Sequence, residues 1–288
     1  MAENLSKNLS KLSKRGPHRV LVGDLSYAGL PGKVYTPAEG DGVPGVAFGH
    51  DWLRGLKNYH VTLRHLASWG IAVAAPETET GFSPNHRGFA ADLETAVQIL
   101  AGVRLGHGNV TVGPGKLGVI GHGMGAGCAV LAAAGSTKIR AVGALYPATT
   151  APSSVEAARH LDVPGLVVGS GESALLDAGN PAALAQAWGG EVAYREIDKG
   201  NQQGFTEDTL FKLLLGAARP QVGARETARA LLTGFLLATL GDDKKLSGFA
   251  DPEATAKGFE SLTGEDLADR ADTLGFKSGS GIERSPAN

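Results

Sequence analysis

The clearest chemical pattern in the chain is a set of three glycines, Gly121, Gly123 and Gly125. Apolar residues 117–120 precede them and a run of small residues follows, so the sequence predicts a strand, a sharp turn and a helix. This is the setting of a Gly-x-Ser-x-Gly nucleophile elbow, whose central residue adopts a strained positive φ. Here the central residue is Gly123, which accepts a positive φ without strain but has no side chain that could react.

Four further segments match motifs of one enzyme family, in the family's order. They are residues 45–51, 66–76, 163–172 and 200–205. With the elbow, they make the chain resemble the dienelactone hydrolase family of α/β-hydrolases and its cutinase-like and platelet-activating-factor acetylhydrolase-like relatives, over roughly residues 25–250. The resemblance implies an α/β-hydrolase fold and hydrolysis of carboxylic esters or lactones by a nucleophile, a histidine and an acid.

Carried over position by position, the resemblance places Gly123 at the nucleophile, Glu172 at the acid and Gln203 at the histidine. It makes the backbone N–H groups of Trp52 and Met124 the oxyanion donors, which need no particular side chain. Of the three catalytic positions, only Glu172 keeps a suitable residue type. Gln203 cannot act as a base, because a glutamine amide does not accept a proton near neutral pH.

The distribution of histidines leads to the same expectation without an alignment. In this fold the catalytic histidine follows the acid in the chain. All eight histidines precede the expected acid strand: His18, His50, His60, His65, His86, His107, His122 and His160. Residues 161–288 contain none, so we expect no intact Ser-His-acid triad.

Other groups near the elbow offer weak substitutes. We expect Cys128, inside the elbow helix, to be a small buried packing residue rather than a nucleophile. His122 is expected to be a structural histidine rather than a base. His50 and Asp51 end the oxyanion-side strand, and the resemblance aligns Asp51 with a glutamate that touches the nucleophile in dienelactone hydrolases. Asp51 is therefore either a residue of the old pocket or, as we prefer, a structural or surface carboxylate.

Composition narrows the class of protein. The 288 residues carry a formal net charge of −2, so there is no basic surface to attract nucleic acid. The single cysteine excludes an intramolecular disulfide, and the histidines show no metal-ligand spacing, so we expect neither metal nor cofactor. The sequence shows no secretory signal and no apolar stretch long enough for a membrane span, which favours a cytoplasmic protein.

The elements that must position these residues alternate along the chain. Expected strands are residues 32–35, 45–48, 71–75, 117–120, 141–145, 165–168 and 192–197. Expected helices are residues 59–69, 89–100, 125–134, 155–160, 182–188 and 226–240. This alternation predicts an α/β fold with a mostly parallel, doubly wound sheet in a single domain over residues 20–250. Residues 251–288 are expected to form a polar tail with a short helix at residues 264–274.

Residues 1–19 form a basic N-terminal segment. Leu5, Leu9 and Leu12 follow helical spacing and would form one apolar stripe. Two interpretations remain open: a frayed basic tail, which we favour, or an amphipathic helix in which residues 1–16 contact a partner or a peripheral membrane surface. With no core partner evident for the stripe, we expect removal of residues 1–16 to leave the melting temperature nearly unchanged.

The sequence leaves two main functions open. The favoured one is a catalytically inactive α/β-hydrolase that binds a small acyl or carboxylate ligand, or an unknown protein partner. Its retained N–H donors at the start of the elbow helix would suit such a ligand. The alternative is an ester or lactone hydrolase with non-standard catalytic groups. A designed inactive variant is disfavoured, because two catalytic positions differ together. On this basis, Gly123→Ser combined with Gln203→His should restore weak esterase activity.

Overall fold

A computed structural model describes residues 2–171, 178–207 and 221–279. Its described residues form a nine-stranded sheet in the order β1-β2-β4-β3-β5-β6-β7-β8-β9. The strands are β1 (Val20–Asp24), β2 (Gly32–Pro37), β3 (Gly40–Gly49), β4 (Ala72–Pro76), β5 (Val110–His122), β6 (Val142–Leu145), β7 (Gly165–Ser170), β8 (Val192–Ile197) and β9 (Phe259–Ser261). The strands from β4 to β8 are parallel, whereas β1, β2 and β9 pair antiparallel at the two edges. The predicted mostly parallel α/β sheet is confirmed.

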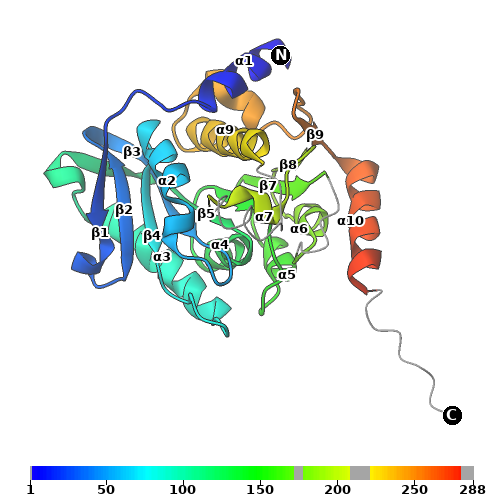
Figure 1. Ribbon diagram of the computed structural model, residues 1–288, viewed down its shortest axis with the longest axis horizontal. Helices are drawn as coiled ribbons and strands as arrows, with labels where there is room; N and C mark the ends of the chain where they lie inside the picture. Colours follow the sequence, from blue (N-terminus) through cyan, green and yellow to red (C-terminus); the bar gives the residue numbers. More distant parts are fainter. Residues whose placement is uncertain (1, 172–177, 208–220, 280–288) are drawn as a thin grey trace.

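Helices cover both faces of this sheet (Figure 1). One face carries α3 (His86–Gly102), α4 (Met124–Gly135), α5 (Ser154–Ala158), α6 (Pro181–Gln186) and α10 (Gly264–Gly279). The other carries α1 (Ala2–Leu12), α2 (His60–Ser68), α7 (Gln202–Phe205) and α9 (Val222–Thr239). Among the described helices, none is both long and apolar enough to cross a bilayer.

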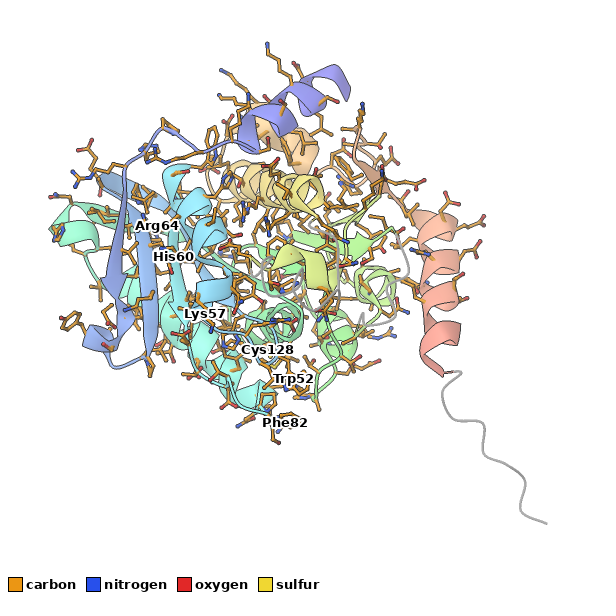
Figure 2. The ribbon with its side chains drawn as sticks, viewed as in Figure 1. Trp52, Lys57, His60, Arg64, Phe82 and Cys128 are labelled. Atoms are coloured by element: carbon orange, nitrogen blue, oxygen red, sulfur yellow. The ribbon has the colours of Figure 1, made fainter. Side chains whose placement is uncertain are left out.

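The central strands are buried on both faces, as their nearly continuous apolar runs predict. Successive residues of β3 alternate between the two cores: Val46 and Phe48 pack on the α9 side, and Ala47 packs on the α4 side. Small residues let α4 approach the sheet closely. Cys128, labelled in Figure 2, lies fully buried within this layer.

The N-terminal segment belongs to the folded domain, which corrects the favoured interpretation of a frayed tail. Residues 2–12 form α1, and Leu5, Leu9 and Leu12 are 5%, 8% and 2% exposed. They join the core around α9 and the short 3₁₀ helix Lys244–Phe249. The leucine stripe is therefore covered by the protein itself. Contact of this segment with a partner or membrane stays a prediction that only its exposed polar face could fulfil.

The C-terminal segment also extends the domain beyond residue 250. Strand β9 pairs with β8, and α10 buries Leu267 and Ala271 against α6. Arg270 Nε forms an ion pair with Glu196 at 2.5 Å. The expected boundary at residue 250 was wrong because short β9 and the narrow apolar face of α10 give little sequence signal. The last dozen residues lie largely outside the described part of the chain.

Candidate functional site

The elbow is present as a backbone shape between β5 and α4. Gly123 has φ 55° and ψ −119°, the positive φ expected from the sequence. A Cβ on Gly121 would lie 2.2 Å from the carbonyl oxygen of Gly125, and a Cβ on Gly125 would lie 2.2 Å from the carbonyl carbon of Gly49. Both outer positions therefore require glycine, because strand and helix are in backbone contact.

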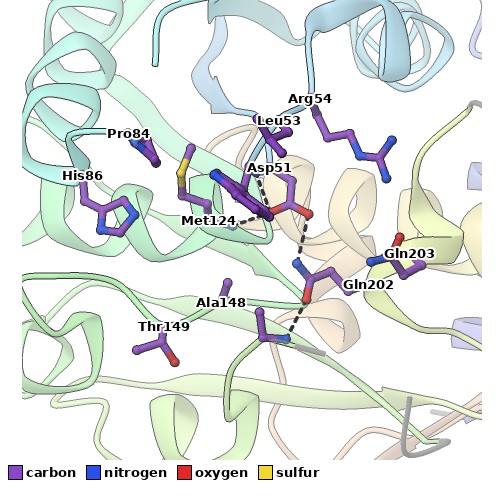
Figure 3. Close-up of a pocket in the computed structure, with 12 residues that line it drawn as sticks. Asp51, Leu53, Arg54, Pro84, His86, Met124, Ala148, Thr149, Gln202 and Gln203 are labelled. Carbon is purple, nitrogen blue, oxygen red and sulfur yellow. Dashed lines mark hydrogen bonds between the residues drawn. The ribbon is translucent and has the colours of Figure 1, made fainter. Parts of the chain in front are cut away.

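The carboxylate of Asp51 lies directly beside the elbow (Figure 3). Its Oδ1 accepts hydrogen bonds from the backbone N–H groups of Met124 and Trp52, each at 2.8 Å. These are the two donors expected to form an oxyanion hole, so they do converge, but on a side chain of the protein itself. A Cβ on Gly123 would lie 2.0 Å from the same Oδ1. The carboxylate thus occupies space that any larger residue at position 123 would need.

The second carboxylate oxygen is bound by a glutamine from α7. Gln202 Nε2 donates to Asp51 Oδ2 at 2.9 Å, and Gln202 Oε1 accepts the N–H of Ala178 at 3.0 Å. Sequence reasoning missed Gln202, since it pointed to the neighbouring Gln203. Gln203 lines the cavity described below, and Glu172 lies outside the described residues.

A buried chain of hydrogen bonds connects the backbone of Asp51 through Tyr59 and His122 to the backbone of Gln202. The N–H of Asp51 donates to the Tyr59 hydroxyl oxygen at 3.1 Å, and Tyr59 lies 2.9 Å from His122 Nδ1. His122 Nε2 lies 3.0 Å from the carbonyl oxygen of Gln202. One neutral tautomer satisfies all of these bonds, with the tyrosine donating to Nδ1 and Nε2–H donating to the carbonyl. His122 is fully buried, and its expected structural role stays a prediction.

His50 fixes the backbone on the other side of the same residue. Its Nδ1 lies 2.9 Å from the carbonyl oxygen of Asp51, and its Nε2 lies 2.7 Å from that of Thr78. The fully buried ring also packs on Phe89, with centroids 4.7 Å apart. A neutral ring has one N–H and so donates to one of these two carbonyl oxygens. Together with the packing on Phe89, this bond makes His50 a positioning residue for the strand end that carries Asp51.

A buried ion pair anchors the loop that follows α7. Glu207 accepts hydrogen bonds from the N–H groups of Val61 and Thr62 at the start of α2, each at 2.8 Å. It also pairs with Arg229 of α9 at 2.9 Å, and both side chains are about nine-tenths buried. This anchor fixes the segment containing Gln202 relative to α2 and hence to Tyr59.

A cavity of about 710 Å³ lies beside Asp51, Met124 and Gln202, and this volume is typical of small-molecule sites. Its lining includes Asp51, with apolar Trp52, Leu53, Pro84 and Met124 and polar Arg54, His86, Thr149, Gln202 and Gln203. His86 Nδ1 accepts the N–H of Ala151 at 3.0 Å, so a neutral ring carries its proton on Nε2. Trp52 of this lining stands edge to face with Phe82, with ring centroids 5.3 Å apart, and the two residues are 44% and 80% exposed (Figure 2).

Two other kinds of group bear on the chemistry of the site: the Cys128 thiol and possible metal ligands. Burial raises the pKa of the Cys128 thiol to about 12, so it stays protonated at neutral pH. Within the part of the chain that the structure describes, no three histidine, cysteine or acidic side chains form a possible metal site.

A comparison with models of protein families identifies the family of the chain. The family model described as "Dienelactone hydrolase family" matches residues 30–209, a segment that runs from β2 through the Gln202 loop to Glu207. No curated protein matches the chain. The matched segment covers more than half of the chain and contains the elbow, Asp51 and both glutamines. The chain therefore belongs to the dienelactone hydrolase family and has that family's α/β-hydrolase fold.

Proposed function

We propose that this chain is a non-hydrolytic member of its family that uses the retained cavity to bind a small organic ligand. One observation carries the proposal: the Asp51 carboxylate accepts both backbone N–H groups that an oxyanion would need. Acyl transfer requires a nucleophile, a base and donors for the developing negative charge. Gly123 has no reactive side chain, no histidine follows His160, and the donors are already engaged.

The position of the Asp51 carboxylate also limits which kinds of ligand the cavity can bind. A carboxylate or ester oxygen could reach Met124 N–H and Trp52 N–H only by displacing Asp51, so the ligand expected from the sequence does not fit at that point. The cavity instead offers aromatic and aliphatic surface with amide, hydroxyl and imidazole groups. We therefore expect a partly apolar molecule whose polar groups hydrogen-bond to side chains such as Thr149 and His86.

Two measurements test this proposal. With para-nitrophenyl acetate and with dienelactone, we expect the purified protein to release product at the buffer rate. Ligand-observed NMR with a library of small aromatic amides and alcohols should identify binders that quench tryptophan fluorescence saturably. Trp52→Phe is the matched control and should lose that quenching, because Trp69 and Trp188 do not line the cavity. A stoichiometric burst of nitrophenol in the wild type, labelling one residue, would overturn the non-hydrolytic claim.

A further inference from the structure

The two oxygens of the Asp51 carboxylate accept hydrogen bonds from different donors. Oδ1 accepts the two backbone N–H bonds, whereas Oδ2 accepts only the Gln202 amide among the described residues. A carboxylate oxygen has two acceptor positions, so Oδ2 retains one lone pair. Asp51 also lines the 710 Å³ cavity while being 8% exposed, which separates it from bulk water.

We infer that Asp51 is a nucleophile toward alkylating electrophiles that enter this cavity, such as benzylic halides. The Oδ2 lone pair attacks the saturated carbon, a C–O bond forms, the carbon–halogen bond breaks, and halide leaves with the bonding electron pair. The product is an alkyl ester of Asp51, and no oxidant, reductant or further reactant is needed.

The occupied oxyanion hole distinguishes this reaction from acyl transfer. Attack on an ester carbonyl creates an oxyanion that needs the two N–H donors, and Asp51 Oδ1 already occupies them. Displacement at a saturated carbon creates no oxyanion on the electrophile. After it, Oδ1 becomes the ester carbonyl oxygen and keeps both backbone donors, so the alkylated residue fits the site that holds the free carboxylate.

The surroundings also determine the fate of the ester. Hydrolysis would need a base to activate water. Among the described residues of the cavity, Gln202 and Gln203 are amides, and His86 Nδ1 already accepts the N–H of Ala151. We therefore expect the Asp51 ester to accumulate rather than turn over.

Intact-mass spectrometry with para-nitrobenzyl bromide tests the inference. The wild type should gain a single nitrobenzyl group, with a rate that saturates as the reagent concentration rises, and peptide mapping should place the group on Asp51. Hydroxylamine should release it, since hydroxylamine cleaves carboxylate esters but not the thioether that Cys128 would give.

Asp51→Asn is the matched variant, because its Oδ1 can still accept both backbone N–H groups, and it should lose the saturable labelling. If this variant does not fold, peptide mapping and hydroxylamine release on the wild type decide alone. Labelling confined to Cys128 or spread over surface residues, or an equal rate in folded Asp51→Asn, would overturn the inference.

Discussion

At the scale of single residues, the glycine at position 123 and the position of the Asp51 carboxylate depend on each other. A Cβ at position 123 would lie 2.0 Å from Asp51 Oδ1, and the backbone there has φ 55°. Glycine therefore permits both the turn and the position of the carboxylate. In the sequence, Gly123 looks like the loss of a nucleophile. In the structure, a glycine at this position is required for the Asp51 carboxylate to lie where it does.

This coupling gives a prediction about stability. Gly123→Ala should lower the free energy of unfolding by the backbone strain of about 1–3 kcal/mol, plus the cost of displacing Asp51. In an Asp51→Gly background the second cost disappears, so the same substitution should be less destabilising. Chemical denaturation of the four chains in this double-mutant cycle measures the coupling. Equal effects of Gly123→Ala in both backgrounds would show that the carboxylate does not occupy this space.

A second residue gives the fold a dependence on pH. His65 is 7% exposed, and burial, aided by Arg229, lowers its pKa to about 4 from an ordinary 6.5. Between these values the unfolded chain binds a proton that the folded chain does not, so stability falls as pH drops from 6.5 to 4, by about 3 kcal/mol. Denaturation curves across this range should show that loss in the wild type and a smaller loss in His65→Gln. An equal pH slope in both proteins would contradict the assignment.

Much of the site could be predicted from the sequence, but not its hydrogen bonding. The elbow glycines and the positive φ of Gly123 follow from local pattern, because both depend on neighbours in the chain. The position of the Asp51 carboxylate depends on Met124, 73 residues away, and on Gln202, 151 residues away. A local sequence pattern does not indicate such long-range contacts. The sequence therefore predicts that the N–H groups of Trp52 and Met124 can bind a ligand oxygen.

At the scale of elements, α1 shows how a clear pattern led to a wrong expectation. The leucine spacing indicated an amphipathic helix, but the surface that covers it comes from α9 and the 3₁₀ helix beyond residue 240. The strands were easier to predict, because β3 to β8 are buried on both faces and read as apolar runs. Edge strand β1 and three-residue β9 lack that signal and were missed.

The packing of α1 reverses the expectation for its removal. Leu9→Ala should lower the free energy of unfolding by about 2–5 kcal/mol, since Leu9 is 8% exposed within the core around α9. Lys7→Ala, on the exposed face of the same helix, is the control and should have little effect. Removal of residues 1–16 should lower the melting temperature clearly. An unchanged melting temperature after that removal would mean that the stripe does not pack on the domain.

At the scale of the whole molecule, the C-terminal segment completes the far edge of the sheet. Arg195 of β8 is fully buried, and burial lowers its pKa to about 10. Its guanidinium donates to the carbonyl oxygens of Asp251 and Pro252, and it lies 5.5 Å from the Phe259 ring centroid. The chain beyond residue 250 therefore compensates a buried charge as well as pairing with β8.

A chain ending at residue 250 should accordingly be much less stable. It loses the carbonyl partners of Arg195 and the strand that pairs with β8, so a sheet edge that is buried in the full chain becomes exposed to water. Truncation after residue 279 is the matched control, because it keeps β9 and α10. Thermal unfolding and light scattering should show a lower melting temperature and aggregation for the first chain only. Equal behaviour of the two chains would restore the boundary expected at residue 250.

We propose that the Asp51 carboxylate, and not only the residue types at positions 123 and 203, prevents ester hydrolysis. The direct measurement is para-nitrophenyl acetate hydrolysis by Gly123→Ser/Gln203→His, with and without Asp51→Gly. Contrary to the expectation from sequence, the double variant should stay at the buffer rate, because its serine Cβ would meet Asp51 Oδ1. The triple variant, whose oxyanion donors are released, should hydrolyse the ester weakly. Hydrolysis by the double variant as fast as by the triple variant would show that Asp51 does not block the reaction.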